Sequence, residues 1–156
     1  MTDPEVRPAT EDDAEALAAA YRSAYAENRR LGFPAEAESA TANEVAEWIL
    51  EHRVLVAELD GELVGGVRLE ATEADRVKLS RLGVRADRKG EGVGSALLDR
   101  AEAAVRECGY GTVWLTTPGD HPYLPDLYRR RGYEETGTYP LEYREYDEIV
   151  MEKRVR

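Results

Sequence analysis

The most constraining feature of the sequence is a glycine-rich turn that joins a predicted strand to a predicted helix. The strand spans residues 77–84, and the turn runs from Lys89 to Gly94 with the letters KGEGVG. After the turn, apolar residues recur every three or four positions, as they do along one face of a helix, and Gly109 marks its expected end. These apolar positions are Leu97, Leu98, Ala101, Ala104, Val105 and Cys108. The pattern predicts a fold built around this strand, turn and helix.

A glycine-rich turn at the start of a helix has a chemical use. Glycine lets the backbone approach a ligand closely, and the first N–H groups of the helix point at that ligand with the positive end of the helix dipole. The turn is therefore a predicted seat for a phosphate or pyrophosphate. It lacks the Gly-Lys-Ser/Thr ending of a P-loop and the GxGxxG spacing of a dinucleotide site. Taken alone, the turn leaves open that it only connects strand and helix.

Two motifs in this chain resemble those of the GNAT (GCN5-related) N-acetyltransferases. The acyl-CoA loop of that family reads Gln/Arg-x-x-Gly-x-Gly/Ala, which Lys89, Gly92 and Gly94 match with Lys in the first position. Further along, residues 127–133 read LYRRRGY and match the family pattern Leu-Tyr-x-x-x-Gly-Phe/Tyr. The motifs occur in the family's order and at its spacing. The resemblance covers residues 5–154.

The predicted strand before the turn changes its pattern partway along. Val77 and Leu79 lie on one face of a regular strand, whereas Leu82 and Val84 lie on the other. Such a shift predicts a β-bulge near Ser80-Arg81. In the GNAT family a bulged strand splays away from its neighbour, and the resemblance implies that the pantetheine arm of the cofactor enters that gap.

The resemblance implies an α/β (α+β) fold in a single domain, residues 1–156. We expect a mixed, mostly antiparallel sheet of six to seven strands, splayed at the middle and flanked by about four helices. Local signals agree with this expectation. Residues 54–59 and 62–70 read as a hairpin around Asp60-Gly61, followed by a charged turn over residues 71–76.

The resemblance also implies an activity and a set of site residues. The activity is direct transfer of an acetyl group from acetyl-CoA to a primary amine within a ternary complex, without a metal. The predicted cofactor-binding residues are Leu82, Gly83, Val84, Lys89, Gly90, Glu91, Gly92, Val93, Gly94 and Ser95. A backbone N–H of residues 82–84 is the implied oxyanion donor. Tyr128 is the predicted general acid, because a phenol with an ordinary pKa of about 10 holds its proton at neutral pH; a core role is the alternative.

The sequence does not identify a general base. Lys78 stands where the family often has a carboxylate. Glu73, Asp75 and His121 are alternatives, although a loop histidine is expected to be exposed, and relay through water would also suffice. A non-catalytic acyl-CoA-binding regulatory domain therefore stays open as a second hypothesis. The acceptor could equally be a small molecule or a protein amine.

Charge and composition narrow the partners. The chain has 32 acidic and 21 basic residues, a net charge of −11, which argues against nucleic acid or an anionic membrane as a partner. We expect a cytoplasmic protein whose partners are acetyl-CoA and an amine, with a homodimer allowed. The acidity, with lysine only at Lys78, Lys89 and Lys153, favours a surface suited to high salt over attraction of a cationic substrate. The lone Cys108, on the apolar helix face, is predicted to be buried.

Overall fold

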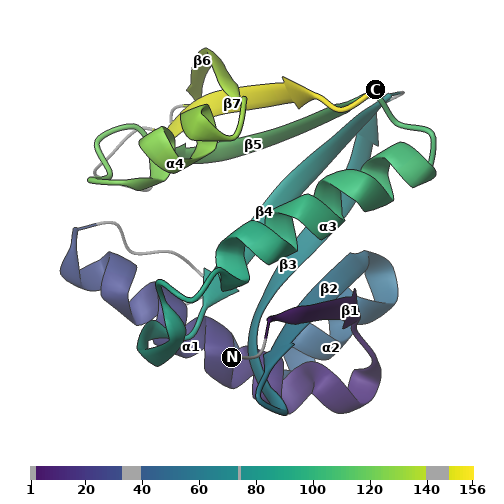
Figure 1. Ribbon diagram of the computed structural model, residues 1–156, viewed down its shortest axis with the longest axis vertical. Coiled ribbons are helices and arrows are strands. Elements are labelled where there is room, and N and C mark those ends of the chain that lie inside the picture. Colours follow the sequence, from purple (N-terminus) through teal and green to yellow (C-terminus); the bar gives the residue numbers. More distant parts are fainter. Residues whose placement is uncertain (1–2, 33–39, 74, 140–147) are drawn as a thin grey trace.

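A computed structural model describes residues 3–32, 40–73, 75–139 and 148–156 as an open, twisted sheet with helices on both faces (Figure 1). The strands of the described part are β1 (Glu5–Pro8), β2 (Arg53–Leu59), β3 (Glu62–Glu73), β4 (Arg76–Val84), β5 (Thr112–Pro118), β6 (Glu134–Tyr139) and β7 (Glu148–Arg154). They form a 7-stranded sheet in the order β1-β2-β3-β4-β5-β7-β6. Within it β4 and β5 run parallel, and the other neighbouring pairs are antiparallel. The predicted mixed, mostly antiparallel sheet is confirmed.

The helices divide between the two faces. They are α1 (Ala14–Arg30), α2 (Ala42–Glu51), α3 (Val93–Glu107) and α4 (Leu124–Arg130). Leu97 and Leu98 of α3 pack with Leu69 and Leu79 of the sheet in one buried cluster, and Figure 1 shows α3 lying across β3 and β4. On the other face, α1 and α2 pack against β2 in a second cluster that includes the fully buried Tyr21. Two cores with a sheet between them hold the strands in a fixed layer.

The predicted bulge is present in β4. Between the paired residues Gly66–Gly83 and Arg68–Ser80, β3 contributes one residue and β4 contributes two. Arg81, one of those two, has a φ of 51°, in the left-handed region that side chains rarely adopt. A bulge of this kind bends its strand and increases the local twist.

The sheet splays directly beyond this irregular strand. β4 and β5 pair only where Arg76, Val77 and Lys78 meet the residues from Thr112 to Trp114. β4 then continues to Val84 and β5 to Pro118 without further pairing, and Figure 1 shows the two strands separating from the end near the C-terminus. The predicted splay is confirmed.

Two local expectations need correction. Cys108 is exposed rather than buried, because α3 ends at Glu107 and Cys108 lies at its C-cap, where the apolar face no longer applies. There its Sγ accepts a hydrogen bond from Arg53 Nη1 at 3.2 Å. The charged turn after β3 is also shorter than predicted, since pairing of Glu73 with Arg76 carries the hairpin almost to its tip. Within the described ranges no helix has both the length and the apolar character needed to cross a membrane.

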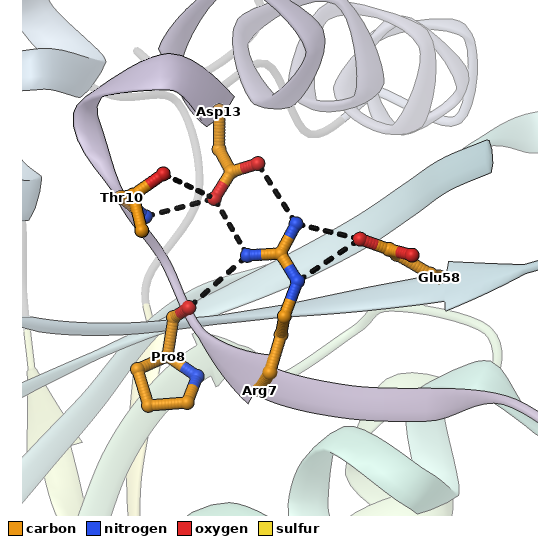
Figure 2. A network of polar contacts seen from close by, with 5 residues as sticks. All are labelled: Arg7, Pro8, Thr10, Asp13 and Glu58. Carbon is orange, nitrogen blue, oxygen red and sulfur yellow. Dashed lines mark hydrogen bonds and ion pairs between the residues drawn. The ribbon is translucent and has the colours of Figure 1, made fainter. Parts of the chain in front are cut away.

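One ion-pair network fastens the edge strand β1 to its surroundings (Figure 2). Arg7 donates hydrogen bonds to both carboxylate oxygens of Asp13, at 2.8 and 2.9 Å, and contacts Glu58 Oε1 on β2 at 2.6 and 2.9 Å. Asp13 also accepts the N–H of Thr10 at 2.8 Å, at the start of the helical segment that continues into α1. These hydrogen bonds lower the pKa of Asp13 to about 2, and the bond from Arg7 has the largest effect.

Asp13→Asn should make the free energy of unfolding less dependent on pH in the acid range. A carboxylate whose pKa is lowered in the folded state stabilises the fold above its unfolded pKa, and that stability is lost as pH falls through the folded value. Arg7 is 40% exposed, so solvent screening reduces the expected loss in the variant to about 1 kcal/mol at neutral pH. Urea unfolding should show this deficit shrinking as pH falls from about 5 to about 2. Asp12→Asn, at an exposed neighbour, is the matched control; an equal deficit in both variants would contradict the network.

Candidate functional site

A cavity of about 330 Å³ opens where β4 has parted from β5. It is lined by the end of β4, the glycine-rich turn, the start of α3 and residues of α1 and α4. Of the ten predicted cofactor residues, all except Glu91 contribute to this lining. Glu91 is exposed and pairs with Arg88 at 3.7 Å. The fold thus gathers the predicted positions around one cavity; their binding of a cofactor stays a prediction.

The glycine-rich turn leaves open space in front of the helix N-terminus. Gly90 and Gly92 have φ values of 83° and 85°, and a Cβ added to either would meet nothing within 4 Å. A Cβ on Gly94 would meet only Val84 Cγ2, at 4.0 Å. Gly92 is the N-cap of α3 and has no side chain to occupy the first N–H groups of the helix. The backbone therefore forms an open cradle that fits a phosphate or pyrophosphate.

A cationic side chain lies at the mouth of this cradle. Lys89 is exposed, and its Nζ donates to the Tyr123 hydroxyl at 3.2 Å and lies 5.8 Å from the Tyr123 ring centroid. Arg88, next to it, is instead held by carboxylates, with Glu62 at 3.5 Å and Asp60 at 3.6 Å. Both cations therefore lie beside the turn, where an anion would approach.

The end of β4 presents backbone groups toward the gap. Tyr25 of α1 donates its hydroxyl proton to the Leu82 carbonyl at 2.8 Å, which fixes the strand after the bulge. Burial raises the pKa of Tyr25 to about 12, an effect that the charge of Arg81 partly offsets, so this hydroxyl stays protonated. Arg85 N–H donates to a carbonyl of β3 at 2.8 Å. Because successive N–H groups point to opposite edges of a strand, the Val84 N–H faces the side that β5 has left.

Tyr128 lies on α4, of which Leu124 and Leu127 line the cavity and Tyr128 itself does not. It is buried, with its ring packed edge-on against Tyr133 at 5.7 Å between centroids. Burial raises the pKa of Tyr128, and the nearby Tyr25 and Glu148 raise it further. The phenol is therefore protonated at neutral pH and close enough to Tyr25 and Glu148 to share their electrostatic environment.

None of the candidate bases expected from sequence is among the residues that line the cavity. Glu73 and Asp75 are exposed at the tip of the β3–β4 hairpin, and the Asp75 carbonyl accepts N–H groups at the start of β5, where β4 and β5 are still paired. His121 is buried, not exposed as predicted. Its Nδ1 accepts the N–H groups of Tyr123 and Leu124 at 3.3 and 3.2 Å, so it caps the first turn of α4. This capping role depends on which backbone N–H groups the His121 ring accepts, and its position in a loop does not reveal them.

Sequence reasoning missed Glu148. This carboxylate is buried at the start of β7, paired in register with Pro118 and on the same face as Trp114, which itself pairs with Lys78. Its charge acts on Tyr25, which lines the cavity, on Lys78, the last residue of β4 paired with β5, and on Tyr128. An acidic residue at the end of a mostly apolar strand is a weak signal, since it is equally typical of an exposed strand end.

Comparisons with known proteins agree with this geometry. The profile of the Acetyltransferase (GNAT) family matches residues 15–133. The S-alkylcysteine N-acetyltransferase of Bacillus subtilis (strain 168) is 32% identical over 143 residues, which cover 86% of this chain and 80% of that protein.

Solved structures show the same fold at low identity. The ribosomal-protein-alanine N-acetyltransferase of Brucella melitensis has a TM-score of 0.81 and 24% identity, covering 96% of this chain and 99% of its own. The PaiA N-acetyltransferase of Thermoplasma acidophilum, solved in complex with coenzyme A, has a TM-score of 0.80 and 20% identity, covering 98% and 99%. These likenesses support the fold. Together with the family profile and the Bacillus relative, they lead to one conclusion: this chain belongs to the GNAT family of acetyltransferases.

Proposed function

We propose that this protein transfers the acetyl group of acetyl-CoA directly to a primary amine within a ternary complex. Family membership makes it an acetyl-CoA-dependent N-acetyltransferase. The observation that carries the finer proposal is a cavity that extends from the glycine-rich turn to the end of β4 that is not paired with β5. A donor held along this cavity and an amine entering from the α1 and α2 face would meet without a covalent enzyme intermediate.

Different parts of acetyl-CoA bind the glycine-rich turn and the gap between β4 and β5. The pyrophosphate binds the free N–H groups at the start of α3, beside Lys89, because those groups and the helix dipole favour negative charge. The pantetheine arm lies along the edge of β4 that β5 has left unpaired. Its thioester carbonyl then comes near the Val84 N–H, which supplies the oxyanion donor.

The transfer requires one bond to form and one to break. The neutral amine nitrogen attacks the thioester carbon, and the carbonyl oxygen takes up negative charge beside the Val84 N–H. The C–S bond then breaks, and Tyr128 gives its proton to the departing thiolate and recovers one from solvent. The acylated nitrogen loses its extra proton to Glu148, a buried carboxylate whose charge acts on Tyr128, directly or through water. Glu148 then returns this proton to solvent, which balances the proton that Tyr128 takes up, so atoms and charge balance without another reactant.

The comparisons favour an enzyme over a non-catalytic acyl-CoA-binding domain. The Bacillus relative is named for acetylating S-alkylcysteine, a small molecule with a primary amine. This supports a small amine as the acceptor class here. Loss of the usual carboxylate at Lys78 does not exclude catalysis, because Glu148 lies on the same face of the sheet.

Gly94→Leu should block the cradle without damaging the fold. The added side chain would begin in open space, since a Cβ there meets only one atom at 4.0 Å, and Leu is a better helix former than Gly. Calorimetry should show acetyl-CoA binding weakened at least roughly 10-fold, because the pyrophosphate loses close backbone approach. The melting temperature should hold. Gly137→Leu, on exposed β6 with nothing within 4 Å, is the matched control. Unchanged affinity in Gly94→Leu would remove the pyrophosphate from this turn.

Tyr128→Phe should impair turnover but not stability. The variant keeps the ring packed against Tyr133 and removes only the hydroxyl, so kcat should fall roughly 10- to 1,000-fold while acetyl-CoA affinity and melting temperature change little. Tyr133→Phe is the matched control, because its hydroxyl donates to buried Glu102 at 3.0 Å. That variant should lose stability and keep its kcat. Normal turnover in Tyr128→Phe would leave thiolate protonation to water.

A further inference from the structure

A group of basic side chains lies on the α1 and α2 face of the sheet, beside the gap. Arg68 pairs in register with Ser80, and the next pair on the same face is Glu70 with Lys78. The intervening pair, Leu69 with Leu79, packs into the core under α3, which confirms that the two sets face opposite ways. Lys78 is the last residue of β4 that pairs with β5. The face that carries Arg68 and Lys78 therefore borders the splay on the side from which an acceptor would enter.

Two guanidinium groups in this region contact one indole ring. Arg68 Cζ lies 5.1 Å and Arg81 Cζ 5.4 Å from the ring centroid of Trp48 on α2. Trp48 is itself packed edge-on against buried Tyr21 at 6.0 Å. A rigid aromatic ring thus places Arg68 and Arg81, here called the arginine pair, at the bulge of β4.

One hydrogen bond orients the Arg68 guanidinium and leaves its two terminal nitrogens available to a ligand. Its Nε–H donates to Ser80 Oγ at 3.1 Å, which fixes the plane of the guanidinium. The side chain is half-buried, and among the described residues no carboxylate forms an ion pair with it. Its two terminal nitrogens remain to meet a planar oxyanion, whose two oxygens they match in spacing.

Arg68 has charged neighbours of both signs, Arg81 and Glu70. Burial lowers the pKa of Arg68, and the charge of Arg81 lowers it further. Burial also lowers the pKa of Lys78, while Glu148 and Glu70 act against that. A half-buried guanidinium beside another cation is unfavourable in the free protein, and an anion that binds Arg68 would relieve that cost.

We infer that the amine acceptor also carries a carboxylate, as an amino acid does, and that Arg68 binds this carboxylate at the α1 and α2 side of the gap. The inference rests on the proposed function and specifies its substrate class. A carboxylate on the acceptor would distinguish an amino acid from a polyamine, which offers Arg68 no anion.

The first experiment compares amines that differ only in the carboxylate. Acetyl transfer is measured with L-methionine, L-leucine and L-phenylalanine and with their decarboxylated counterparts, 3-(methylthio)propylamine, isopentylamine and phenethylamine. For the side chain that fits best, the amino acid should have a KM lower by roughly 10- to 100-fold than its decarboxylated partner, the range expected for a charge-assisted bidentate contact. Preference for the decarboxylated amines would overturn the inference but leave the N-acetyltransferase activity standing.

The second experiment removes the guanidinium. Arg68→Gln should erase the difference between the paired amines by raising the KM of the amino acid alone, with kcat for the decarboxylated amine and acetyl-CoA affinity unchanged. Arg68→Lys keeps a cation near Trp48 but loses the planar fork, and it should restore little of the preference. Arg76→Gln is the matched control, since Arg76 lies on the same face of β4 and contacts Trp114 at 5.6 Å, at the paired end of the strands. Equal loss in the Arg76 and Arg68 variants would assign Arg68 a structural role and overturn the inference.

A binding measurement separates this inference from the activity itself. Calorimetry of the protein saturated with CoA, which cannot transfer an acetyl group, should detect the preferred amino acid and fail to detect it in Arg68→Gln. Binding that depends on Arg68 supports the inference even if turnover is undetectable with the amines tested. Binding that is the same in the wild type and in Arg68→Gln overturns it, whether or not acetyl transfer occurs.

Discussion

The separation of β4 from β5 is the constraint on which this structure depends. Neighbouring strands usually pair along their shared length, because unpaired N–H and C=O groups are unfavourable when buried. Here the bulge at Arg81, with its φ of 51°, turns β4 aside after Lys78. A left-handed conformation at a residue with a side chain costs on the order of 1–3 kcal/mol, and the two packed cores and the bond from Tyr25 to Leu82 hold it in place. The freed edge of β4 is then available to a substrate.

The proposed reaction assigns roles to the elements around that edge. The glycine turn receives the pyrophosphate, Tyr128 of α4 protonates the thiolate, and Arg68 binds the carboxylate of the acceptor. These groups come from segments far apart in the chain, and the sheet order brings them together.

The parts of this arrangement that could be predicted from sequence are those set by neighbouring residues. The glycine spacing predicts the cradle, and the change of face between Leu79 and Leu82 predicts the bulge, because both follow from local backbone geometry. The role of His121 could not be predicted, since it depends on which N–H groups its ring meets, and Cys108 was placed wrongly because the helix ends one position earlier than its apolar pattern. Glu148 and Arg68 were missed because their significance lies in contacts with strands and helices distant in sequence.

Amide hydrogen exchange with and without acetyl-CoA tests the central claim most directly, because it reads backbone N–H groups in the whole chain. If the unpaired edge of β4 and the glycine cradle together hold the donor, saturating acetyl-CoA should slow exchange at residues 82–84 and 90–95. The amides of β1 and β2, at one edge of the sheet, should exchange as they do without acetyl-CoA. Exchange that slows only in other segments, or in none, would contradict the claim that this splay is the donor site.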